Sequence, residues 1–105
     1  MDPRTVRQRR EELQILDVRD DEEWVAGRIE GAVHIPLSQL SARLGELDPD
    51  RLVVTVCRSG KRADKAAEQL TAAGLSAQVM EGGMQRWERQ QLPFSTPDGR
   101  PSRVG

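Results

Sequence analysis

Residues 53–64 read Val-Val-Thr-Val-Cys-Arg-Ser-Gly-Lys-Arg-Ala-Asp, an apolar run that passes through a short basic loop into a helical pattern. The run is β-branched and uninterrupted, which predicts a buried strand. Cys57, the only cysteine in the sequence, is therefore expected between the carboxyl end of this strand and the amino end of a helix. Backbone N–H groups at a helix start lack intrahelical partners, and the helix dipole is positive there, so the position favours a thiolate or a bound anion. The stretch predicts a reactive cysteine.

The charges beside Cys57 support this prediction. Lys61 and Arg62 fall in the first turn of the predicted helix, where each cation is disfavoured by about 0.3–1 kcal/mol. Together with Arg58 they place three cations within six residues. Cations at this position lower the stability of the helix, so their presence indicates a function that requires positive charge there. The loop is thus suited to a negatively charged group.

Hydrophobic patterns on both sides of this stretch predict alternating strands and helices. We expect strands at residues 13–18, 32–35, 52–56 and 75–80, and helices at residues 3–12, 20–26, 38–44, 61–73 and 84–90. Asp2 and Ser38 are the predicted N-caps of the first and third helices. The alternation predicts a single α/β domain with a central, mostly parallel sheet and helices on both faces. Ligands bind such sheets at the carboxyl ends of the strands, where Cys57 lies.

Length and composition limit the class of protein. A chain of 105 residues is enough for one domain, which we place at residues 1–94, followed by a disordered or loosely attached tail at residues 95–105. The mean hydropathy is −0.64, and no apolar stretch reaches the length of a membrane span. The first residues carry no secretory signal pattern, so the expected location is the cytoplasm.

The charged and metal-binding residues exclude several kinds of partner. Sixteen basic and seventeen acidic residues nearly cancel, so no nucleic-acid or membrane partner is expected. One cysteine and one histidine, His34, cannot form a structural zinc site or an internal disulfide. His34 is far from Cys57 in the sequence and is predicted to be a packed or surface residue. We expect neither a metal nor another cofactor.

Four segments within residues 15–93 together resemble the single-domain rhodanese-like sulfurtransferases in their order and spacing. They are Leu16-Asp17-Val18-Arg19 with Trp24, the run Gly-Arg-Ile-Glu-Gly-Ala-Val-His-Ile-Pro-Leu at residues 27–37, Cys57-Arg58-Ser59-Gly60-Lys61-Arg62, and Gly82-Gly83-Met84 with Trp87 and Pro93. The resemblance implies a thiosulfate sulfurtransferase in which Cys57 carries sulfane sulfur as a persulfide. A small anionic donor such as thiosulfate would load the sulfur, and cyanide, a thiol or a protein would accept it. The implied chemistry needs no cofactor.

The resemblance also implies roles for the residues of the Cys57 loop, which we define as residues 57–62. Arg58, Lys61 and Arg62 would hold the thiolate and the anionic donor, and Arg62 would also stabilise the end of the loop. Ser59 would donate a hydrogen bond to the persulfide. Gly60 would supply the backbone freedom that a sharp turn needs.

Outside the loop, Asp17 and Arg19 are expected in a supporting role, either binding the loop's cations or fixing its conformation. A turn at Gly82-Gly83 would let the following segment approach the active site. One departure from the family is visible, because Arg28 stands where relatives often have histidine.

Two other functions remain open. Cysteine phosphatases and arsenate reductases also use an anion-binding loop, but the phosphatase pattern has five residues between cysteine and arginine, whereas Cys57 and Arg62 enclose four. The shorter loop fits a single sulfur better than a tetrahedral oxyanion. Alternatively, the chain is a non-catalytic module that senses sulfide or redox state, although such modules commonly lack the cysteine.

Overall fold

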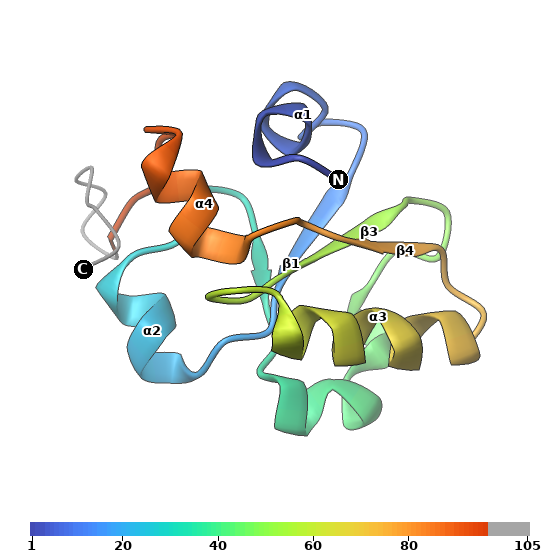
Figure 1. Ribbon diagram of the computed structural model, residues 1–105. Coiled ribbons are helices and arrows are strands. Elements are labelled where there is room, and N and C mark those ends of the chain that lie inside the picture. Colours follow the sequence, from blue (N-terminus) through green and yellow to red (C-terminus); the bar gives the residue numbers. More distant parts are fainter. Residues whose placement is uncertain (97–105) are drawn as a thin grey trace.

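A computed structural model describes residues 1–96 and shows the predicted alternation of strands and helices (Figure 1). The elements in chain order are α1 (Pro3–Gln8), β1 (Gln14–Asp17), α2 (Asp21–Ala26), β2 (Val33–His34), the 3-10 helices η1 (Leu37–Ala42) and η2 (Leu44–Glu46), β3 (Val53–Val56), α3 (Lys61–Ala72), β4 (Ala77–Val79) and α4 (Gly83–Arg89). Within the described residues, no helix is both long enough and apolar enough to cross a membrane.

The four strands form one parallel sheet in the order β2-β1-β3-β4, which confirms the predicted sheet type. Asp17, at the end of β1, lies opposite His34 of β2 and Val56 of β3. The carboxyl ends of these three strands therefore meet at one edge of the sheet. Cys57 follows Val56 directly and lies at that edge, as the sequence predicts.

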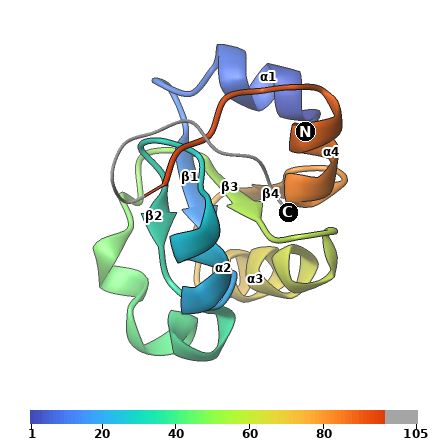
Figure 2. The same cartoon turned by 90° about the vertical axis from the view of Figure 1, so that its left-hand side faces the viewer.

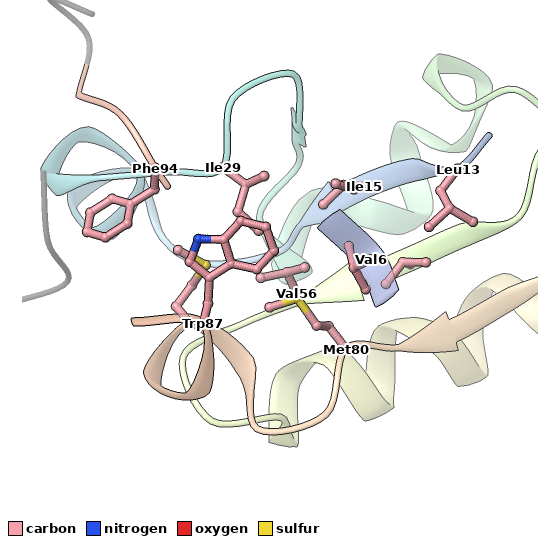
Figure 3. Packing of buried hydrophobic residues seen from close by; sticks show 10 residues of the cluster. Val6, Leu13, Ile15, Ile29, Val56, Met80, Trp87 and Phe94 are labelled. Atoms are coloured by element: carbon pink, nitrogen blue, oxygen red, sulfur yellow. The ribbon is translucent and has the colours of Figure 1, made fainter. Parts of the chain in front are cut away.

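Helices cover both faces of the sheet, and each face has its own hydrophobic cluster. Helices α1 and α4 lie on one side, while α3 and the 3-10 helices lie on the other (Figure 1). Consecutive residues of β3 point to opposite sides, so Val54 joins the first cluster and Val53 the second. Trp87 of α4 is fully buried in the first cluster, near Val56 (Figure 3).

Two helices differ from the prediction. Asp2 caps α1 through a 2.8 Å hydrogen bond from the Arg4 N–H, but the helix ends at Gln8 rather than at residue 12. The predicted α-helix at residues 38–44 with Ser38 as N-cap is wrong, because η1 begins at Leu37 and is followed by the separate helix η2. Pro36 accepts an i to i+3 bond from Gln39, and the short leucine-rich segment buries Leu40 without completing an α-helix.

Most of the predicted tail, residues 97–105, lies outside the described residues. Ser95, the first residue assigned to the tail, forms an antiparallel bridge with Arg28. The two residues exchange backbone hydrogen bonds of 2.7 and 2.8 Å. Ser95 is therefore held against the segment that follows α2.

The buried hydroxyl of Thr55 links the sheet to α3. Its Oγ1 donates to the Ala63 carbonyl at 2.9 Å, and the side chain is fully buried. We expect Thr55→Val to lower the free energy of unfolding by about 1 kcal/mol, because valine fills the space but leaves that bond unmade. Urea denaturation measures the change. Thr71→Val, at an exposed position of α3, is the matched control. Equal stability of the two variants would contradict the expectation.

Candidate active site

Cys57 lies in the four-residue turn that connects β3 to α3. The residue is 1% exposed, and its Sγ accepts a hydrogen bond from the Gly60 N–H at 2.9 Å. Gly60 has φ +123°, a conformation that side chains disfavour, yet an added Cβ would meet no atom within 4 Å. The glycine is therefore required by backbone conformation rather than by lack of space. It folds the chain so that its own N–H reaches the sulfur.

The start of α4 fixes the other side of the Cys57 loop. The Met84 N–H donates to the Cys57 carbonyl at 2.8 Å, and the Gln85 N–H donates to the Arg58 carbonyl at 3.0 Å. The peptide groups of the described residues are trans, so the N–H that follows each of these carbonyls points away from α4. Helix α4 thus binds the Cys57 and Arg58 carbonyls on one side, while the N–H groups of Arg58 and Ser59 point to the other.

Gly83 allows this close approach. An added Cβ would lie 2.4 Å from the Cys57 carbonyl oxygen and 2.5 Å from that of Arg58, and φ is +60°. Both the space and the conformation exclude a side chain. The turn predicted at Gly82-Gly83 therefore brings α4 against the loop.

The structure places the Gly60 N–H against the Cys57 sulfur, and the side chains of the other predicted loop residues differ in exposure. Arg58, Ser59 and Lys61 are exposed, whereas Arg62 is half-buried. Both terminal nitrogens of Arg62 donate to Glu23 of α2, at 2.6 and 2.9 Å. Figure 2 shows α2 beside α3, which this ion pair joins. Arg62 is therefore fixed to a neighbouring helix.

The ion pair changes the acidity of both partners. The hydrogen bonds from Arg62 hold the pKa of Glu23 below its ordinary value of 4.5, and burial opposes that effect. In turn, the Glu23 carboxylate raises the pKa of Arg62, with a smaller contribution from negative charge on Cys57. Arg62 thus interacts electrostatically with both Glu23 and the sulfur.

The two supporting residues bind each other. Asp17 and Arg19 are 1% and 2% exposed, and the Arg19 guanidinium donates to both carboxylate oxygens of Asp17 at 2.8–3.0 Å. Arg19 also donates to the Gly27 carbonyl at 2.6 Å. This buried pair connects the end of β1 to the end of α2. It thereby supports the helix that carries Glu23.

Trp24 of α2 contacts the side chains of His34 and Arg28. Its ring stacks on His34 with centroids 4.6 Å apart, and the Arg28 guanidinium lies 4.7 Å from the Trp24 ring centroid. His34 Nε2 lies 2.8 Å from the Arg19 carbonyl oxygen. His34 is thus a packed residue, as predicted. Arg28, at the position that departs from the family pattern, contacts the indole ring.

The sequence did not single out Glu23, which pairs with Arg62 of the Cys57 loop. Acidic residues in the first turn of α2 suit the helix dipole, so the sequence pattern gives no reason to expect a partner for Glu23 outside its own helix. Glu23 does accept a hydrogen bond from the Asp20 N–H at 3.1 Å, as expected three residues after an N-cap. Its partner Arg62 is 39 residues away, so only the topology brings them together.

Comparison with known proteins identifies the family. A model described as the rhodanese-like domain matches residues 2–90. The chain belongs to this family. The fold agrees, because a rhodanese-related protein from Thermoplasma volcanium superimposes with a TM-score of 0.86 at 29% identity, covering 90% of this chain and 94% of that one.

Two of the curated relatives with sulfurtransferase names align with this chain over most of their own length. The putative sulfurtransferase YtwF of Bacillus subtilis is 40% identical over 83 residues, which are 79% of this chain and 81% of that protein. A sulfurtransferase of Allochromatium vinosum is 33% identical over 90 residues, covering 85% of this chain and 84% of the relative. The predicted rhodanese-like family and fold are confirmed, and these similarities support sulfur transfer in general.

The Glu23–Arg62 pair predicts a pH-dependent contribution to stability. Because the folded-state pKa of Glu23 is depressed, the contribution is present above about pH 4.5 and is lost as pH falls through the folded-state value. We expect Glu23→Gln to lower the free energy of unfolding by about 0.5–1 kcal/mol at pH 7 and by less at pH 3. The effect is small because both side chains are partly exposed. Urea unfolding at both pH values measures this. The cost of Thr55→Val serves as a pH-independent control, and a Glu23→Gln cost that does not change with pH would contradict the expectation.

Proposed function

We propose that this protein is a thiosulfate sulfurtransferase that moves sulfane sulfur from thiosulfate or a related donor to a thiophilic acceptor. The sulfur would travel as a persulfide on Cys57, and the acceptor would be cyanide, a small thiol or a protein thiol. The single observation that carries the proposal is the hydrogen bond from the Gly60 N–H to Cys57 Sγ, in a loop whose carbonyls are held by α4. This arrangement supports negative charge at the sulfur.

In the first half-reaction, the Cys57 thiolate attacks the outer sulfur of thiosulfate. A bond forms between Sγ and that sulfur, the S–S bond of thiosulfate breaks, and its electron pair leaves with sulfite. The products are Cys57–S–S⁻ and SO₃²⁻, so total charge and atoms are unchanged. Arg58 and Lys61, the exposed cations of the loop, would bind the donor's anionic oxygens.

In the second half-reaction, a nucleophile takes the outer sulfur and leaves the thiolate of Cys57. With cyanide the products are thiocyanate and the free enzyme, which completes a double displacement through a covalent intermediate. The sequence contains no second cysteine to resolve the persulfide as an internal disulfide. The sulfur must therefore pass to an external acceptor.

We infer that residues 1–94 are the catalytic unit and that the reaction takes place in the cytoplasm. The covalent chemistry requires Cys57 as a free thiolate, which a reducing compartment preserves. No metal or organic cofactor takes part in either half-reaction.

The phosphatase alternative remains a testable outcome, since it would use the same cysteine.

Steady-state kinetics with thiosulfate and cyanide test the proposal. The wild-type protein should form thiocyanate, with the parallel-line pattern of double displacement when both substrates are varied. The same preparation should also be assayed for hydrolysis of an aryl phosphate. Cys57-dependent phosphate release, without thiocyanate formation from thiosulfate or a thiosulfonate, would overturn the proposal in favour of a phosphatase.

A further inference from the structure

The three cations of the Cys57 loop are not equivalent. Arg58 and Lys61 extend into solvent, where they can meet an arriving anion. Arg62 instead places its two terminal nitrogens 2.6 and 2.9 Å from the two carboxylate oxygens of Glu23. A bidentate pair of this kind neutralises the guanidinium and fixes its orientation. Arg58 and Lys61 therefore remain as the exposed positive charges of the Cys57 loop.

Glu23 is itself held in place. Its Oε1 also accepts the Asp20 N–H at 3.1 Å, which ties the side chain to the start of α2. The next residue, Trp24, stacks on His34 of β2 with an interplanar angle of 7°. Helix α2 is thus linked to the sheet, and Glu23 pairs with Arg62 from that helix.

We propose that Glu23 is a positioning residue that neutralises Arg62 and thereby sets how strongly the Cys57 loop attracts an anionic sulfur donor. This inference rests on the proposed function. With Arg62 neutralised, the two exposed cations match the two negative charges of thiosulfate. If Glu23 lost its charge, Arg62 would become a third cation close to the sulfur and would increase the attraction for the donor.

The experiment measures loading of Cys57 in a single turnover, from the sulfite released after mixing with thiosulfate. We expect Glu23→Gln to raise the second-order loading rate constant by about three- to tenfold, because one unit of positive charge is unmasked at a partly solvated site. The increase should shrink as ionic strength rises. It should also be smaller with a monoanionic thiosulfonate, because the attraction scales with the charge of the donor.

Three further variants separate this electrostatic role from a structural one. Glu23→Asp keeps the charge and should restore loading toward the wild-type rate. In an Arg62→Gln background, Glu23→Gln should have no further effect, because its partner is absent. Glu46→Gln removes the carboxylate from a similar bidentate pair with Arg43, with distances of 2.6 and 3.0 Å, and should leave loading unchanged.

The outcomes distinguish this inference from the proposed function. If the wild-type protein releases neither sulfite from thiosulfate nor sulfinate from a thiosulfonate, the proposed function fails. If the wild type loads sulfur but Glu23→Gln loads at the same rate or more slowly, the inference about Glu23 is overturned. Equal effects of Glu23→Gln with and without Arg62 would also overturn it.

Discussion

Replacing Cys57 with serine is expected to abolish sulfur transfer while leaving the fold intact. Serine fills nearly the same space, and its hydroxyl can accept the hydrogen bond that Gly60 now donates to Sγ. A hydroxyl, however, is a far weaker nucleophile at neutral pH and cannot carry a persulfide. Thiocyanate formation from thiosulfate and cyanide should fall to the uncatalysed rate.

Thermal unfolding provides the control for this variant. We expect Cys57→Ser to change the free energy of unfolding by no more than about 1 kcal/mol, because the substitution conserves volume and a hydrogen-bond acceptor. Lost activity in a folded protein would then assign the chemistry to the sulfur atom. Thiocyanate formation at more than a few percent of the wild-type rate would show that Cys57 is not the sulfur carrier.

Replacing Gly83 with alanine is expected to damage both stability and activity. The new Cβ would lie 2.4 Å from the Cys57 carbonyl oxygen, and the backbone at φ +60° disfavours a side chain. Because neighbouring atoms are backbone, α4 must move away from the loop and lengthen the bonds from Met84 and Gln85. We expect a cost of about 3 kcal/mol in unfolding free energy and about a hundredfold slower sulfur transfer.

Gly74 offers a matched control for Gly83. It also has a positive φ, +89°, but an added Cβ there would meet no atom within 4 Å. Gly74→Ala should therefore cost only the conformational strain, about 1 kcal/mol, and should leave sulfur transfer unchanged. Similar stability and activity in the two alanine variants would contradict the role given to the contact between α4 and the Cys57 loop.

Local signals in the sequence predicted much of the architecture. The β-branched run before Cys57 identified β3, and the helical pattern after Gly60 identified α3. Cys57 lies between these two elements. The two signals therefore also predicted its position at the carboxyl end of β3, on one edge of the parallel sheet. Glycine pairs mark sharp turns, and that rule predicted the turn at Gly82, which is followed by α4 from Gly83.

The interactions that complete the site depend on contacts between distant segments. Glu23 meets Arg62 only because α2 lies beside α3 in the folded chain. Gly83 cannot accept a side chain because of two carbonyl groups that lie about 25 residues earlier in the sequence. The leucines after Pro36 fit both α and 3-10 geometry, so their spacing could not distinguish the two. Sequence periodicity contains no information about distances between segments that lie far apart in the sequence.

The geometry supports the proposed sulfur transfer through a single thiol. Helix α4 binds the carbonyls of the Cys57 loop, Gly60 turns its N–H toward the sulfur, and the exposed cations lie on the same loop. Each contribution comes from a different element, and the parallel sheet brings these elements together at one edge. The topology thus builds the proposed reactive position around one side chain, that of Cys57.

The central claim is that Cys57 carries the transferred sulfur, and intact-mass spectrometry tests it most directly. After incubation with thiosulfate and removal of excess donor, the wild-type protein should gain the mass of one sulfur atom, and cyanide should remove it. The Cys57→Ser variant should keep its original mass throughout. A wild-type protein that gains no sulfur from thiosulfate, polysulfide or a thiosulfonate, or a Cys57→Ser variant that gains it equally, would contradict the account.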